Sequence, residues 1–238
     1  MKCLAYLLTL WCSATTVAAD ITVFAAASLK EPLDQITAEV GGVTVAYGGS
    51  GTLARQVSLG APADVVILAN ADWMDVLEDA EKISGRVDLL SNRLVVVSRE
   101  SAPVDLTTDG LTTALNGGHL AMGFTASVPA GIYGKAALLR LDLWNSVAPQ
   151  VAEVDSVRAA LALVARGEAP LGIVYETDVR VAPDLHIAAI FPTQSHPPIR
   201  YVGALVQDTA KAAAFLDYLQ SEHAQSIFIS AGFLPSAP

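Results

Sequence analysis

Short apolar runs rich in β-branched residues alternate along the chain with segments of helical periodicity. The first run is Ile21–Ala25, and Ser28 with Glu31 then fits a capping box that predicts a helix start. Further strands are expected at Val43–Tyr47, Ala63–Leu68, Arg93–Ser98, His119–Gly123, Leu171–Tyr175, Ile187–Phe191 and Arg200–Val206. Helices are expected at Thr52–Leu59, Asp72–Asp79, Pro129 to Leu141, Val157–Arg166 (capped by Asp155 or Ser156), Asp208 to Leu219 and from Ser221. This alternation predicts an α/β fold with parallel sheets and helices on both faces.

Four turns at expected helix starts carry small or hydroxyl-bearing residues: Ala26–Ser28, Gly49–Gly51, Val128–Gly131 and Asp155–Val157. In sheets of this kind, ligands bind outside the carboxyl ends of the strands, next to helix N-termini. A helix N-terminus exposes N–H groups without acceptors, so several aimed at one point would bind an anion without lysine or arginine. Each turn alone also fits an ordinary cap, tight turn or helix start. Their number, in both halves of the chain, favours an anion site.

Patterns typical of enzymes are weak in this sequence. Gly48–Thr52 resembles a nucleophile elbow, but Thr52 stands where the final glycine belongs. The four histidines form no zinc-binding pattern, and neither a P-loop nor a dinucleotide fingerprint is present. Asp64, at a strand start, fits a ligand or, more simply, a turn-stabilising carboxylate. We therefore expect a protein that is not an enzyme and has no catalytic residue.

Composition narrows the choice of partners. The net charge of −10 makes nucleic acid and anionic membrane surfaces poor partners. A hydrophobic content of 53% with 16% charged residues predicts a well-packed core. After the first segment, no apolar run is long enough to cross a membrane.

Residues 1–19 have the pattern of a secretory signal peptide. Lys2 precedes the apolar stretch from Leu4 to Trp11, and small residues precede Asp20. Both cysteines lie in this segment, so the mature chain would contain neither a thiol nor a disulfide. Lipid anchoring at Cys12 is not expected, because Trp11 is too bulky for that processing. The expected location is the periplasm.

Six motifs cover nearly all of the mature chain: Ile21–Leu29, Gly49–Gln56, Gly60–Asp64, Val128–Tyr133, Val157–Val164 and Gly167–Tyr175. In these motifs the chain resembles the periplasmic molybdate-binding proteins of ABC importers. The resemblance implies a two-lobed periplasmic binding protein fold, type II-like, with a mainly parallel, helix-flanked sheet in each lobe and a ligand cleft between them. The expected lobes are residues 20–95 plus 197–238 and residues 96–196, joined by two crossings that form a hinge.

The resemblance also implies a set of ligand-binding residues. Carried over by position, Ser28 and Ser50 would give hydroxyl and backbone donors, Ala130 and Val157 backbone N–H groups, and Tyr175 its phenolic hydroxyl. Molybdenum or tungsten would be held as the oxyanion, through hydrogen bonds to its oxygens. No cofactor is implied.

Two departures from the family pattern concern the shape of the cleft. Phe124 and Thr125 stand where many relatives carry an Asp-Pro pair, and glycines flank Ser50 where serines are common. Neither removes a ligand that the resemblance implies. Both bear on fine selectivity.

The expected function is that of a monomeric, extracytoplasmic solute-binding protein. It would capture molybdate, and tungstate, and deliver it to the permease and ATPase of an ABC importer. A site made only of donors suits a dianion, since the proton that phosphate carries at neutral pH would find no acceptor, and sulfate must be rejected by size. The alternatives left open are a binding protein for sulfate, another oxyanion or a small carboxylate, a secreted α/β enzyme, and an extracellular sensor or adhesion module.

Overall fold

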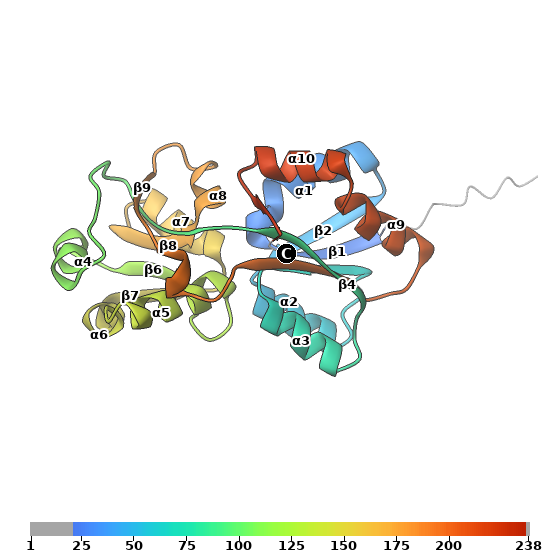
Figure 1. Ribbon diagram of the computed structural model, residues 1–238, viewed down its shortest axis with the longest axis horizontal. Helices are drawn as coiled ribbons and strands as arrows, with labels where there is room; N and C mark the ends of the chain where they lie inside the picture. The colour runs from blue at the N-terminus through green and yellow to red at the C-terminus, as the bar shows by residue number, and fades with distance from the viewer. Residues whose placement is uncertain (1–20, 237–238) are drawn as a thin grey trace, which may run out of the picture.

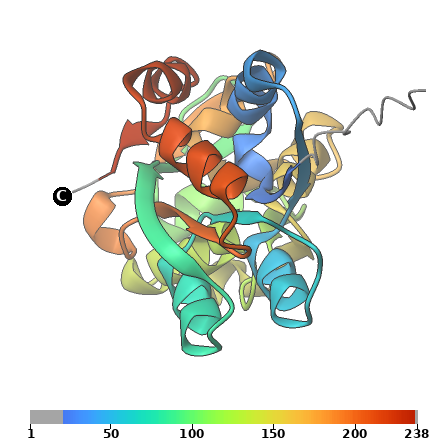
Figure 2. The same cartoon turned by 90° about the vertical axis from the view of Figure 1, so that its right-hand side faces the viewer.

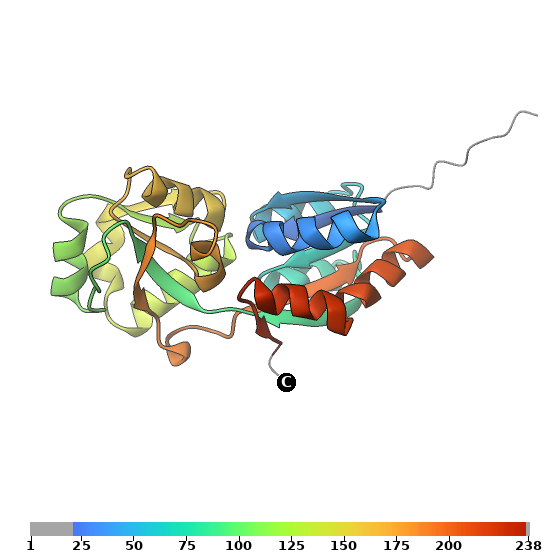
Figure 3. The same ribbon diagram turned by 90° about the horizontal axis from the view of Figure 1, so that it is seen from above.

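Two lobes lie side by side in the computed structural model, which describes residues 21–236 (Figure 1). The chain passes between the lobes from β4 to β5 and returns between β9 and β10 (Figure 3). The expected signal peptide, residues 1–19, lies outside the described residues. Among residues 21–236, none of the helices has the length and apolar character needed to cross a membrane.

The first lobe is built on a six-stranded sheet of order β11-β4-β10-β3-β1-β2. Helices α1, α9 and α10 lie over one face, and α2 and α3 lie over the other (Figures 1 and 2). Its strands are β1 (Ile21–Ala26), β2 (Val43–Gly48), β3 (Val65–Leu68), β4 (Ser84–Ser91), β10 (Arg200–Leu205) and β11 (Leu234–Pro235). Its helices are α1 (Lys30–Val40), α2 (Ser50–Ser58), α3 (Ala71–Asp79), α9 (Ala210–Leu219) and α10 (Glu222–Ser230).

The second lobe contains a five-stranded sheet of order β7-β6-β8-β5-β9. Helices α7 and α8 lie over one face, and α5 and α6 over the other (Figure 1). Its strands are β5 (Leu94–Ser98), β6 (Leu120–Gly123), β7 (Val151–Val154), β8 (Leu171–Tyr175) and β9 (His186–Ile190). Its helices are α4 (Thr108–Leu115), α5 (Pro129–Arg140), α6 (Trp144–Val147), α7 (Val157–Ala165) and α8 (Glu176–Val179).

Strand direction requires a correction. The strand β1 runs parallel to β2 and β3, and β6 runs parallel to β7 and β8. However, β10 is antiparallel to β3 and β4, and β5 is antiparallel to β8 and β9. The strand β10 enters the first lobe from the side at which β1 and β3 end, so it runs the opposite way. The two-lobed α/β fold is confirmed, with mixed rather than mainly parallel sheets.

The capping box predicted at Ser28 is wrong. Ser28 lies in a short 3-10 turn, Ala27–Leu29, and α1 begins after it without a side-chain cap. The Ser28 hydroxyl instead contacts the Tyr201 hydroxyl, and Glu31 pairs with Arg158. Tertiary partners therefore replace the local hydrogen bonds that the sequence pattern predicted.

Some elements, two helix caps and the partner of Asp64 also differ from the sequence prediction or make it more specific. The strands β4 and β7 and the helix α4 were not predicted, because few of their positions are fully buried and the apolar pattern is weak. The hydroxyl of Ser156 caps α7, and Thr209 rather than Asp208 caps α9. The Asp64 carboxylate accepts a hydrogen bond from the Thr22 N–H at 2.7 Å, so it binds the start of β1 and not the backbone of its own turn.

Candidate functional site

Ser28 lies in the 3-10 turn Ala27–Leu29 that follows β1. It is 2% exposed, and its Oγ lies 2.8 Å from the Tyr201 hydroxyl. The side-chain amide of Asn92 donates to the same Tyr201 hydroxyl at 3.3 Å. Either hydroxyl of this pair can be the donor. Since Asn92 already donates to the Tyr201 oxygen, we assign Tyr201 as the donor to Ser28, an arrangement in which the Ser28 proton is free to point into the site.

Ser50 is the first residue of α2 and is 1% exposed. Its hydroxyl oxygen accepts a hydrogen bond from the Ala69 N–H at 3.1 Å. The hydroxyl proton of Ser50 is therefore free to donate, like that of Ser28. The Ser50 N–H, at the first position of the helix, has no acceptor within the helix.

Ala130 and Val157 occupy the first turns of two helices in the second lobe. Pro129 starts α5, where its fixed φ suits the first helical position, and places the Ala130 N–H second. Ser156 caps α7 by accepting from the Ala159 N–H at 3.2 Å, which leaves the Val157 N–H without an intrahelical acceptor. Both residues are buried.

Tyr175 ends the apolar strand β8 and is 1% exposed. Among the described residues its hydroxyl finds no hydrogen-bond partner. Burial raises the pKa of this hydroxyl well above its ordinary value, so it stays a neutral donor. A buried hydroxyl without a partner is costly, and it is satisfied most simply by a ligand.

All five predicted residues line one small cavity between the lobes. Ala26, Ala27, Gly48, Gly49, Ala69, Val128 and Pro129 complete its lining. About 10 Å³ is open to the centre of a water-sized sphere, which is about the room that one water molecule needs. None of these lining residues carries a charged side chain, so hydroxyl and backbone N–H dipoles dominate the electrostatics of the site.

Contacts across the cleft bring the lobes together around this cavity. The Ser127 carbonyl accepts from the Gly51 N–H at 3.2 Å and from the Trp73 indole N–H at 3.1 Å. The Asn70 amide donates to the Tyr133 hydroxyl at 3.1 Å. A Cβ at Gly49 would overlap the Asp155 carbonyl oxygen. The glycines beside Ser50 thus permit the close approach of the second lobe.

Residues 21–234 match the bacterial extracellular solute-binding protein family. The chain belongs to this family. The solute-binding protein is 44% identical over 226 residues to the molybdate-binding protein ModA of Escherichia coli, covering 90% of this chain and 88% of that one. It is 37% identical over 228 residues to ModA of Haemophilus influenzae, covering 90% of each. The periplasmic molybdate-binding protein of Azotobacter vinelandii shares the fold, with a TM-score of 0.79 at 23% identity, over 92% of this chain and 100% of that one.

Of the two departures noted in the sequence, Gly49 lines the cavity of the solute-binding protein, whereas Phe124 and Thr125 lie outside its lining. Phe124 is 41% exposed, and its carbonyl accepts from the N–H groups of Ser127 and Val128. The Thr125 N–H donates to the Glu153 carboxylate at 2.9 Å. Phe124 and Thr125 therefore shape the loop before α5 without lining the cavity.

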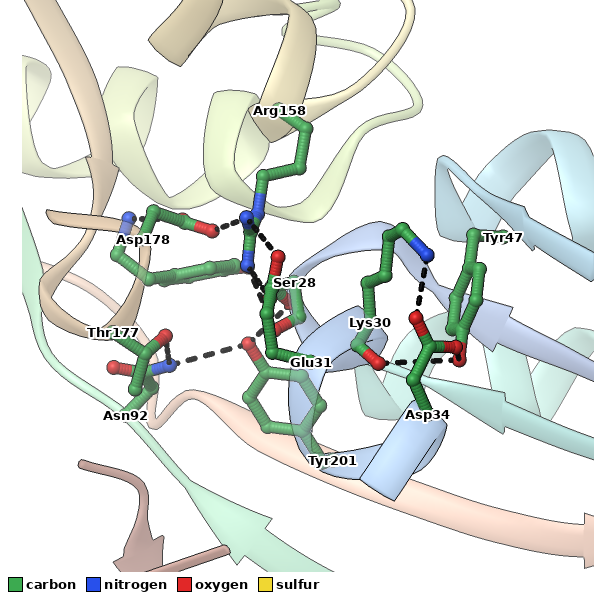
Figure 4. A network of polar contacts seen from close by, with 11 residues as sticks. Ser28, Lys30, Glu31, Asp34, Tyr47, Asn92, Arg158, Thr177, Asp178 and Tyr201 are labelled. Atoms are coloured by element: carbon green, nitrogen blue, oxygen red, sulfur yellow. Dashed lines mark hydrogen bonds and ion pairs between the residues drawn. The ribbon is translucent and has the colours of Figure 1, made fainter. Parts of the chain in front are cut away.

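A network of polar groups beside the cavity was not found from the sequence (Figure 4). Arg158 forms an ion pair with Asp178, from its Nε to Oδ1 at 2.7 Å. The other carboxylate oxygen of Asp178 accepts from the Tyr175 N–H at 3.0 Å. Arg158 follows Val157 directly, and Asp178 comes three residues after Tyr175, but neither spacing by itself indicates this pairing.

Proposed function

We propose that this solute-binding protein captures molybdate, and tungstate, in the cavity between its lobes. The observation that carries the proposal is the unpartnered Tyr175 hydroxyl in a cavity lined by uncharged groups. The names of the two relatives described above agree with this choice of ligand.

The donor set suits a tetrahedral dianion. The Ser50 oxygen accepts from the Ala69 N–H, and with Tyr201 assigned as the donor to Ser28, both serine hydroxyl protons are available to a ligand. With Tyr175 and the N–H groups of Ala130 and Val157, the cavity offers donors from both lobes. Hydrogen bonds to a charged acceptor are about twice as strong as neutral ones, which compensates for the lost hydration of the anion.

The same donor set discriminates between anions. Phosphate carries a proton at neutral pH, and this proton would meet donors instead of an acceptor. Sulfate is fully ionised and smaller, so it is disfavoured by the fixed spacing of the helix N-termini. Molybdate and tungstate have nearly equal size and should bind alike.

Transport follows from lobe closure. We infer that residues 20–95 plus 197–238 and residues 96–196 move about the two crossings, and that ligand favours the closed form because only closure unites the two donor sets. The mature, monomeric protein would be periplasmic after removal of residues 1–19. It would deliver its ligand to the permease and ATPase of an ABC importer, without catalysing a reaction.

Titration calorimetry of the mature chain with molybdate, tungstate, sulfate and phosphate tests the proposed ligand. Molybdate and tungstate should bind tightly, and the other two anions much more weakly. Sulfate binding as tight as molybdate binding would refute the choice of ligand. Ser28→Ala or Ser50→Ala should weaken molybdate binding by about 1–3 kcal/mol each, the value of a lost hydrogen bond to a charged group.

A further inference from the structure

Arg158 reaches from the second lobe to the first. It is the second residue of α7, and its guanidinium makes a two-pronged contact with the Glu31 carboxylate on α1, at 2.9 and 2.5 Å (Figure 4). The guanidinium also donates to the Ser28 carbonyl at 3.4 Å. These contacts tie the α7 end of the cavity to the α1 end.

The two carboxylates that pair with Arg158 differ in the lobe to which they belong and in their burial. Asp178 belongs to the same lobe as Arg158 and its side chain is fully buried, so this pair can persist when the lobes separate. Glu31 belongs to the opposite lobe and its side chain is 42% exposed. Opening the cleft therefore breaks the pair with Glu31, while Asp178 keeps the guanidinium oriented for the next closure.

Grooves border this contact on both sides. One groove of about 500 Å³ and another of about 370 Å³ are each lined by Glu31 and Arg158. The ion pair is thus a bridge between two open regions of the cleft. Water can enter from either side and solvate both partners as soon as the lobes begin to part.

We propose that the Glu31–Arg158 pair is a latch that sets how long the ligand stays bound. Arg158 is a positioning residue, because it holds the Ser28 carbonyl and, through Asp178, the Tyr175 backbone, without lining the cavity. The pair forms only on closure, so it slows release and leaves capture by the open form unchanged. This inference rests on the proposed function for the choice of ligand.

The test compares Glu31→Gln with Glu39→Gln in the mature protein. Glu39 lies on the same helix but pairs with His223 of α10 within the first lobe, at 2.7 Å. Molybdate release is followed by stopped-flow fluorescence of Trp73, which contacts Ser127 across the cleft. Glu31→Gln should release molybdate about fivefold faster, the effect of an ion pair worth about 1 kcal/mol, with an unchanged association rate. Release from the wild type should accelerate with added salt, and release from Glu31→Gln much less so.

Equal release rates for Glu31→Gln and the wild type, or an equal acceleration in Glu39→Gln, would overturn the latch. Failure of the wild type to bind molybdate would instead refute the proposed ligand. In that case the latch is judged on the anion-free protein, with one spin label in each lobe. Glu31→Gln should then shift the distance distribution toward the open form, and an unchanged distribution counts against the latch.

Discussion

The hydroxyl oxygens of Ser28 and Tyr201 lie 2.8 Å apart, although the two residues are separated by 173 positions in the chain. Tyr201 lies on β10, directly after the chain returns to the first lobe. Asn92, at the other crossing, donates to the Tyr201 hydroxyl. The two segments that connect the lobes thus orient the hydroxyl of a cavity residue, which couples the hinge to the site.

Tyr201→Phe should weaken molybdate binding about fivefold to tenfold. The variant removes the Tyr201 hydroxyl that contacts the Ser28 hydroxyl, and with it a hydrogen bond worth about 1 kcal/mol. Ser28 could then turn its proton away from the ligand. Calorimetric titration measures the change, and Tyr218→Phe on α9 serves as the matched control. Unchanged affinity in Tyr201→Phe would show that the Ser28 hydroxyl needs no such orientation.

Tyr175→Phe should lower the affinity for molybdate without lowering the stability of the ligand-free protein. Molybdate affinity should fall about tenfold or more, because a hydrogen bond to a charged acceptor is lost. The free energy of unfolding without ligand should stay constant or rise, because the variant removes a buried hydroxyl that has no partner among the described residues. Titration and urea denaturation provide the two values. A large loss of stability would mean that the hydroxyl has a structural partner.

Gly49→Ala should impair closure. The added Cβ would overlap the Asp155 carbonyl oxygen of the opposite lobe and touch Val128. Binding should weaken about tenfold or more, since overpacking costs about 1–3 kcal/mol. Thermal unfolding of the ligand-free variant should match that of the wild type, because the clash exists only between closed lobes. Wild-type affinity in this variant would show that the lobes need not approach so closely.

Asp178 should give stability a pH dependence. Burial raises the pKa of its carboxyl from 3.8 to about 6, although Arg158 and the Tyr175 N–H favour the charged form. Since the folded carboxyl holds its proton more tightly than the unfolded one, this contribution to stability is full below pH 3.8 and is lost as the pH rises through about 6.

Compared with Asp178→Asn, the wild type should therefore gain stability as the pH falls from about 6 to about 4, by at most about 1.4 kcal/mol per pH unit. Denaturant unfolding of both proteins over this range measures the difference. Parallel pH profiles would show that the carboxyl has an ordinary pKa in the folded protein.

The site residues that the sequence predicted are marked by local signals, whereas the features that were missed depend on contacts between residues far apart in the chain. Pro129 and the run that begins at Val157 mark helix starts through local signals, and the apolar strand ending at Tyr175 is equally local. Such signals predict where helices and strands end, but not which of these ends lie together in space. The family resemblance predicted that these five residues lie at one site. The cavity that joins Ser28, Ser50, Ala130, Val157 and Tyr175 follows that expectation, and their roles as ligands stay predictions.

The missed features depend on contacts between distant parts of the chain. Ser28 and Glu31 satisfy a local capping pattern, yet their side chains turn to Tyr201 and Arg158. The spacing of residues in the sequence does not predict partners such as Tyr201 and Arg158, which lie more than a hundred positions away. The strand β4 was missed for a related reason, because only Leu89 and Leu90 of its residues are fully buried.

Anomalous scattering at the molybdenum edge, from crystals of the mature protein grown with molybdate, would locate the bound anion. We expect one strong peak in the cavity between the lobes, with its surrounding oxygens within hydrogen-bonding distance of the Ser28, Ser50 and Tyr175 hydroxyls and of the Ala130 and Val157 N–H groups. A peak elsewhere on the protein, or no peak in crystals that contain the closed form, would contradict this expectation.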